Sequence, residues 1–227
     1  DLVHWNFQSG SLKSDDLFAA CQEYFDRNKT RLYCFDDLTG YLQALDKTAQ
    51  TKFVEHALKA GADDNKQELV NSVSKLTLNN PFRGVPMINA LKLEYCFQLS
   101  SEEGNISGQE AESFVARCLQ VYREAPRPER DSEPSTIESR PIDDLCVLAA
   151  MCLIRSTGLL SDDRGQSMRD IALIRAASIL EHLLHDSPYN YTALLLLTRV
   201  YLLLGAGSCA LKTFSKLSVK QFQFETV

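Results

Sequence analysis

Helical periodicity along nearly the whole chain is the feature that most constrains how these 227 residues fold. From Asp15 to Asn28 the apolar side chains recur at i, i+1, i+4, i+7 and i+8, which places them on one face of a helix. Similar faces follow. Only Leu32 to Phe35 looks strand-like, and four residues do not make a sheet. We therefore expect an all-α protein.

The expected helices are defined by their apolar positions and end signals. Before residue 124 they cover 15–28, 38–45, 53–61, 64–78, 86–99 and 108–122. Gly61 is the expected C-cap of the third, and Pro86 lies in the first turn of the fifth. After residue 141 they cover 142–157, 168–186, 189–204 and 207–217. The helix over 189–204 is apolar nearly all round, so we expect it to be buried on more than one side.

A repeat pattern lies around residue 200. A tetratricopeptide (TPR) repeat has 34 residues, with apolar, aromatic, glycine, alanine and phenylalanine residues at fixed positions. With Tyr191 as position one, these positions hold Leu194, Leu197, Tyr201, Gly205, Ala210 and Phe214. A small residue on one helix then lets a bulky one on its neighbour approach, and the antiparallel pair must stack on further pairs. The expected architecture is a TPR-like α-solenoid of stacked antiparallel helix pairs.

The composition changes abruptly at residues 124–141, which hold four of the seven prolines and no aromatic residue. Such a segment buries too little apolar area to offset its ordering entropy. The expected organisation is a helical-repeat section over 1–123, a flexible loop or linker over 124–141, and a TPR-like section over 142–227.

Charge and cysteine usage exclude several classes of function. With 24 basic against 30 acidic residues, the chain lacks the overall basic charge of a nucleic-acid binder, and we expect no DNA partner. The longest apolar run, 193–204, is too short to span a bilayer. Seven scattered cysteines without a C-x-x-C pair indicate reduced thiols and a cytoplasmic protein. The chain starts at Asp1 without a targeting pattern, so we expect a section of a longer array.

Five Asp-Asp pairs suggest paired carboxylates, at 15/16, 36/37, 63/64, 143/144 and 162/163. The first four stand where a helical pattern begins, and the fifth lies a few residues upstream of one. Aspartate there accepts hydrogen bonds from amides at a helix start and favours the positive end of the dipole. We interpret the pairs as helix caps rather than catalytic acids or metal ligands.

Three further motifs have structural interpretations. Gly205 to Ala210 matches G-x-G-x-x-A but follows a helix, so a turn between two helices is favoured over a dinucleotide site. His182 and His185 lie on one helix face without a third zinc ligand, and suit a helix C-terminus. The segment 155–160 approaches an acetyl-coenzyme A motif but ends in Leu160. We expect no catalytic residue, cofactor or metal.

Three stretches resemble one known family. They are Tyr33-Cys-Phe-Asp-Asp-Leu-Thr-Gly-Tyr-Leu, Pro141-Ile-Asp-Asp-Leu-Cys-Val-Leu-Ala-Ala, and the segment from Ser187 through Gly205 that continues to Thr226. In this order they resemble the auxiliary, non-catalytic subunit of the NatB N-terminal acetyltransferase complex. The resemblance implies a TPR-like solenoid that wraps the catalytic acetyltransferase subunit. It also implies help in anchoring that subunit at the ribosome, where chains beginning Met-Asp, Met-Glu, Met-Asn or Met-Gln are acetylated.

TPR geometry selects the candidate partner-binding residues. Positions 2, 5, 9 and 12 of a repeat's first helix face the groove, which here are Thr192, Leu195, Arg199 and Leu202. A lone charge in an apolar helix either pairs internally or serves a binding surface, so both roles stay open for Arg199. Two other hypotheses also stay open: a generic TPR-like adaptor unrelated to acetylation, and an all-α enzyme with converging titratable groups.

Overall fold

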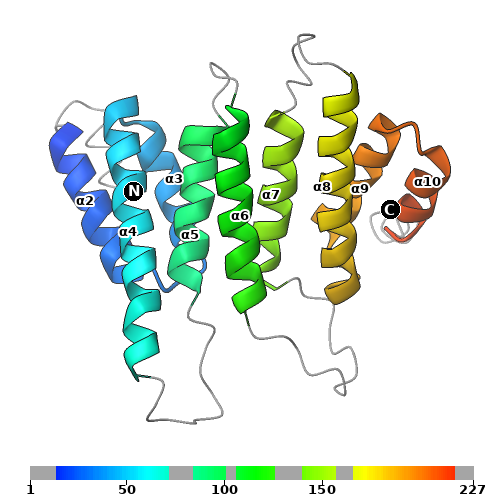
Figure 1. The fold of residues 1–227 in the computed structure, drawn as a ribbon. Helices are drawn as coiled ribbons and strands as arrows, with labels where there is room; N and C mark the ends of the chain where they lie inside the picture. The colour runs from blue at the N-terminus through cyan, green and yellow to red at the C-terminus, as the bar shows by residue number, and fades with distance from the viewer. Residues whose placement is uncertain (1–13, 72–83, 101–105, 126–139, 157–165, 218–227) are drawn as a thin grey trace, which may run out of the picture. The chain divides into compact units, whose positions relative to one another are not determined.

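The computed structural model describes residues 14–71, 84–100, 106–125, 140–156 and 166–217. These ranges hold nine α-helices and one π-helical segment and contain no strand, so the all-α expectation is confirmed (Figure 1). The packing divides the chain into two compact units, 1–102 and 103–227. The elements are α2 Ser14–Asn28, α3 Cys34–Gln43, α4 Lys47–Asn71, α5 Val85–Glu94, η1 Tyr95–Leu99, α6 Gly108–Glu124, α7 Asp143–Ser156, α8 Gln166–Asp186, α9 Tyr191–Leu203 and α10 Gly207–Ser215.

The first unit packs α2, α3, α4 and α5 around one apolar core. Phe53 on α4 lies edge-on to Phe25 of α2, with ring centroids 5.8 Å apart, and both side chains are fully buried. Buried Asn89 of α5 donates hydrogen bonds of 2.9 and 2.8 Å to the carbonyls of Lys29 and Arg31. This side chain therefore holds the turn between α2 and α3 against α5.

The predicted end of a helix at Gly61 is wrong, because α4 continues through this residue to Asn71. Gly61 is buried, and an added Cβ would lie 3.1 Å from the Cα of Met87 on α5. The glycine therefore allows a close approach of two helices rather than ending one. The third and fourth predicted helices are one helix, so Asp63 and Asp64 lie inside it instead of capping its start.

Two other local predictions agree with the structure. The strand-like stretch 32–35 forms no sheet, as expected, and α3 begins within it at Cys34. Pro86 lies at the start of α5 as expected, and that helix passes into the π-helical segment η1. There the Ser100 amide donates to the Tyr95 carbonyl at 2.8 Å, five residues back.

In the second unit, the five helices α6 to α10 pack in sequence, each on the next. Helix α6 also reaches α8, where Arg175 pairs with both carboxylate oxygens of Glu112. Helix α7 likewise contacts α9. Successive helices therefore alternate between two layers, as Figure 1 shows for α6 and α8 in front of α7 and α9. This is the packing expected of a helical-repeat array.

Small side chains line the contacts of this second unit. Each helix buries at least one alanine, and the buried set is Ala111, Ala149, Ala150, Ala176, Ala177, Ala193 and Ala210. Because a methyl group occupies little space, two helix axes can approach closely where it lies. Ala210, the alanine that falls on the repeat pattern, is among them.

Candidate partner-binding surface

The four predicted binding residues lie on one exposed face of α9. Thr192 and Arg199 are exposed, and the side chains of Leu195 and Leu202 are 52% and 61% exposed. Their spacing of three, four and three residues keeps them in line, over about 15 Å of helix. Tyr191 and Leu203, both exposed, fall on the same face. We call these six residues the α9 outer strip.

The expectation that α9 is buried on more than one side is met only in part. Its buried side chains, Ala193, Leu194, Leu197 and Val200, face the neighbouring helices α7, α8 and α10. The outer strip lies on the opposite side of the helix, exposed among the described residues. Helix α9 thus keeps three leucines at the surface, an arrangement that a structural helix does not need.

Both ends of α9 are firmly capped. The Asn190 side chain accepts a hydrogen bond of 3.0 Å from the Ala193 amide, as an N-cap residue does. Gly205 has φ +70°, and the amides of Gly205 and Ala206 donate to the carbonyls of Leu202 and Tyr201. This is a Schellman motif, and it confirms that Gly205 ends one helix at a turn, after which α10 begins at Gly207.

The inner side of α9 is tied to α8 through a hydrogen bond. The Tyr201 hydroxyl donates to the Glu181 carboxylate. Burial, and then this hydrogen bond, raises the pKa of Tyr201 above its ordinary value, so the phenol stays protonated at neutral pH. The donor therefore persists under physiological conditions and helps to orient the outer strip.

Arg199 has no hydrogen bond or ion pair with any residue that the structure describes. Of the two roles left open by the sequence, internal pairing is thus unsupported within the described ranges. In sequence, Arg199 lies between Leu195 and Leu202 of the outer strip. Its guanidinium offers several hydrogen-bond donors to an acidic group on a partner.

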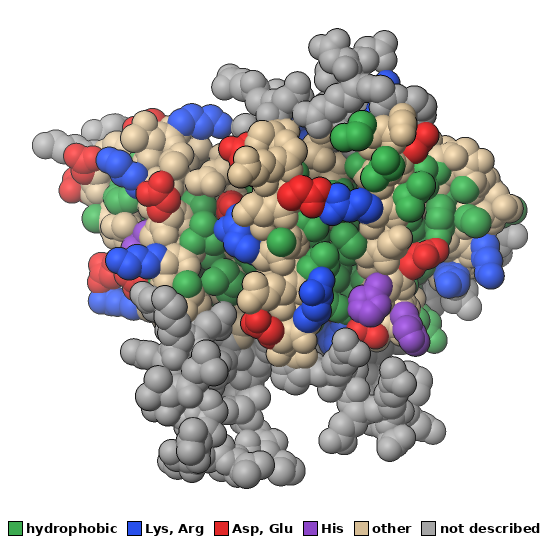
Figure 2. All heavy atoms as spheres, viewed as in Figure 1, with side chains coloured by type: hydrophobic (Ala, Val, Ile, Leu, Met, Phe, Trp, Pro, Cys, Tyr) green, Lys and Arg blue, Asp and Glu red, His purple; other side chains and the backbone are tan. Residues whose placement is uncertain are grey.

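Sequence reasoning missed further exposed apolar residues on the neighbouring helices. On α8, Met168, Ile171 and Ile174 are 65%, 51% and 54% exposed. Figure 2 shows hydrophobic side chains gathered over the N-terminal half of this helix. On α10, Leu211 and Phe214 are 70% and 46% exposed. The sequence does hold a signal for these surface residues, because both helices carry more apolar residues than the single stripe that faces the core.

A buried polar cluster joins three helices of the second unit. Asp143 is fully buried at the start of α7 and accepts hydrogen bonds of 3.0 and 3.1 Å from the backbone amide and Nε of Arg140. Arg140 donates to the Tyr122 hydroxyl, which donates to Asp186, each at 3.0 Å. Burial, with Cys146 and Asp186 nearby, raises the pKa of Tyr122. These contacts join groups within the protein, so we interpret the cluster as structural.

The remaining motifs have structural places. Asp15/16, Asp36/37 and Asp143/144 lie in first helical turns, where their charge suits the helix dipole, but the N-cap of α3 is Tyr33 and makes no side-chain cap bond. The pair 162/163 lies outside the described residues. His182 packs edge-on against Tyr122, with centroids 6.2 Å apart. Within the described ranges, His, Cys, Asp and Glu residues form no group of three that could hold a metal ion. Residues 157–160 of the segment similar to an acetyl-coenzyme A motif also lie outside those ranges.

Comparison with known proteins identifies the family of this chain. The family model of the N-acetyltransferase B complex (NatB) non-catalytic subunit matches residues 3–227. The chain belongs to this family. No curated protein matches it. The resemblance seen in three short stretches of sequence thus extends over nearly the whole chain.

Family membership assigns this NatB subunit a non-catalytic role, and it implies association with the catalytic subunit of the complex. The candidate site is accordingly a surface for a protein partner. None of the helices that the structure describes is both long and apolar enough to cross a membrane.

Proposed function

We propose that this chain is a TPR-like scaffold section of the NatB non-catalytic subunit that binds and positions the catalytic acetyltransferase through the α9 outer strip. The full complex then acts at the ribosome, in the cytoplasm, on nascent chains beginning Met-Asp, Met-Glu, Met-Asn or Met-Gln. The observation that carries the proposal is the exposure of Leu195 and Leu202 on α9. The chain belongs to a family of non-catalytic subunits, which act as part of a complex.

The energetics favour a contact at this strip. Each leucine is more than half exposed, and burying the remaining apolar surface of such a side chain contributes about 1 kcal/mol. Arg199 adds a charge that a partner carboxylate can pair with. Because the caps and the Tyr201–Glu181 hydrogen bond hold α9 in place, little ordering entropy is lost on binding.

Co-expression with the catalytic NatB subunit tests the surface. The Leu195→Glu/Leu202→Glu double variant should lower the affinity for the catalytic subunit at least about tenfold, because it places two charges in an apolar contact. Arg199→Ala should lower it by a smaller factor. Leu32→Glu is the matched control, since Leu32 is 49% exposed in the first unit and should leave binding unchanged. Undiminished co-purification of the double variant would contradict the proposed surface.

Three more experiments test the role itself. The purified chain alone should neither bind acetyl-coenzyme A nor acetylate a peptide, and activity from the isolated chain would overturn the scaffold role. The reconstituted complex should sediment with ribosomes. A pull-down with the full-length protein that recovers partners but no acetyltransferase would instead favour the generic TPR-like adaptor.

A further inference from the structure

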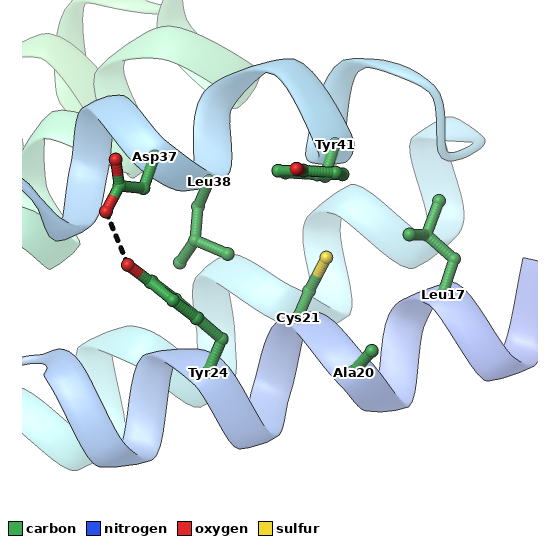
Figure 3. Close-up of a pocket in the computed structure, with 7 residues that line it drawn as sticks. All are labelled: Leu17, Ala20, Cys21, Tyr24, Asp37, Leu38 and Tyr41. Atoms are coloured by element: carbon green, nitrogen blue, oxygen red, sulfur yellow. Dashed lines mark hydrogen bonds between the residues drawn. The ribbon is translucent and has the colours of Figure 1, made fainter. Parts of the chain in front are cut away.

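A second site lies in the first unit, away from the α9 outer strip in sequence. A cavity of about 350 Å³ opens between α2 and α3 and is lined by seven residues, Leu17, Ala20, Cys21, Tyr24, Asp37, Leu38 and Tyr41 (Figure 3). Its volume falls at the lower end of the range for small-ligand sites. No part of the proposed function uses it.

The two ends of this cavity differ in chemistry. At one end the Tyr24 hydroxyl donates to Oδ2 of Asp37, as the dashed line in Figure 3 marks. Toward the other end, the side chains of Cys21 and Leu38 point into the space between the helices, with Leu17 and the Tyr41 ring beyond them. Ala20 contributes only a methyl group at the exposed rim. The site is therefore an open, largely apolar groove with the exposed carboxylate of Asp37 at one end.

The charged end is not neutralised from within. Oδ1 of Asp37 accepts no hydrogen bond from a described residue. The hydrogen bond to Asp37 is the main cause that raises the pKa of Tyr24 to about 12, so the phenol remains a neutral donor at physiological pH. The segment from Ser14 to Gln43 holds six acidic against three basic side chains, and one of the bases, Arg27, pairs with Glu23. The local potential thus favours a cation.

We propose that this cavity binds a lysine side chain presented by a partner protein. The methylenes of a lysine side chain can lie along the apolar lining, and its ammonium group can then meet Oδ1 of Asp37. An arginine fork pairs best with two free carboxylate oxygens, whereas Oδ2 of Asp37 already accepts from Tyr24. An anion is repelled at the same end, and an apolar ligand gains nothing from the carboxylate. This inference is independent of the proposed function.

The probe is n-butylammonium, which reproduces the lysine side chain. Its binding to the whole chain is followed through the methyl resonances of Leu17 and Leu38. We expect saturable shifts with a millimolar dissociation constant, about fivefold weaker binding of the uncharged n-butanol, and no shift with butyrate. Equal affinities for n-butylammonium and n-butanol, or no shift with n-butylammonium, would overturn the proposal. Tighter binding of n-propylguanidinium would overturn the assignment to lysine.

Two matched pairs of variants keep the test specific. Asp37→Asn keeps an acceptor for Tyr24 and should reduce the affinity for n-butylammonium to that for n-butanol, whereas Asp36→Asn should leave it unchanged. Ala20→Phe should fill the mouth and abolish the shifts, whereas Ala19→Phe, at the neighbouring exposed position outside the lining, should not. Unchanged binding to Asp37→Asn or to Ala20→Phe would place the cation elsewhere and refute the site.

Discussion

At the scale of single residues, burial decides which groups can react. All seven cysteines are thiols, five of them buried, while Cys96 is partly exposed and Cys209 exposed. Burial raises the pKa of Cys21 to about 11 and, with a smaller contribution from Asp143, that of Cys146 to about 12. The thiolate is the reactive form, so these buried thiols are inert at physiological pH. This agrees with the prediction from the sequence that the cysteines are reduced thiols.

Thiol alkylation tests this directly. At pH 8 we expect iodoacetamide to modify Cys209 first and to leave Cys21, Cys34 and Cys146 unmodified until the chain unfolds. The thiols have a higher pKa in the folded than in the unfolded chain, so above pH about 9 they ionise first in the unfolded chain. The free energy of unfolding should therefore fall as the pH rises above about 9. Mass spectrometry of peptides from native protein gives the order of modification. Early labelling of Cys146 would show that the second unit opens more readily than its burial indicates.

The buried carboxylate of Asp143 should contribute measurably to stability. Asp143→Ala removes the acceptor of the Arg140 amide and the charge opposite its guanidinium, which is only 25% exposed. We expect the free energy of unfolding to fall by about 2–3 kcal/mol, because a half-buried charge remains unpaired. Urea denaturation measures it. Asp144→Ala is the control for the neighbouring carboxylate, and an equal loss in both variants would argue against the buried pair.

At the scale of elements, two glycines that look alike in sequence differ in their surroundings. Gly40 and Gly61 both lie inside helices, α3 and α4. A Cβ at Gly40 meets nothing within 4 Å, whereas one at Gly61 meets backbone atoms of Met87 at 3.1 and 3.3 Å. Only Gly61 is therefore required by packing, and Gly40 merely lowers helix propensity.

Alanine substitutions at these two glycines should change stability in opposite directions. Gly40→Ala should raise the free energy of unfolding by about 0.5–1 kcal/mol through helix propensity. Gly61→Ala gains the same propensity but forces α4 and α5 apart, with a net loss of about 1 kcal/mol, and Gly61→Leu should lose more. Urea denaturation of the three variants gives the comparison. If Gly61→Ala instead raised the free energy of unfolding, Met87 would be able to move away from the added Cβ without a loss of packing energy.

At the scale of the whole molecule, exposed apolar side chains gather in the second unit. Helices α8, α9 and α10 together expose Met168, Ile171, Ile174, Tyr191, Leu195, Leu202, Leu203, Leu211 and Phe214. Scattered exposed leucines are ordinary, but a concentration on consecutive helices is typical of surfaces that other proteins cover. This property suits a subunit of a complex better than a protein that works alone.

The isolated chain should accordingly associate with itself. Sedimentation velocity should show an average sedimentation coefficient that rises with protein concentration, and Leu195→Glu/Leu202→Glu should reduce this rise while thermal stability stays unchanged. Adding the catalytic subunit should suppress self-association and raise the melting temperature by mass action. A sedimentation coefficient that does not depend on protein concentration would indicate that the exposed leucines do not mediate self-association.

The sequence by itself determined the helices of this protein. Periodicity placed α7 to α10 to within a few residues, and the glycine at 205 marked a true end, because these signals depend on neighbours about four residues apart. The same local pattern misjudged Gly61, whose reason for being glycine lies on another helix. The domain boundaries at 124–141 stay a prediction, since residues 126–139 lie outside the described ranges.

Only the tertiary structure decided which residues meet. Tyr122 and Asp186 are 64 positions apart, and Tyr24 and Asp37 are 13 apart on different helices, so no local pattern could pair them. Repeat geometry selected four residues of the α9 outer strip as facing a groove. How far they are exposed, and which apolar residues of α8 and α10 join them at the surface, depend on the faces that the neighbouring helices leave uncovered. Helix formation is a local process, whereas burial and pairing depend on how the helices stack.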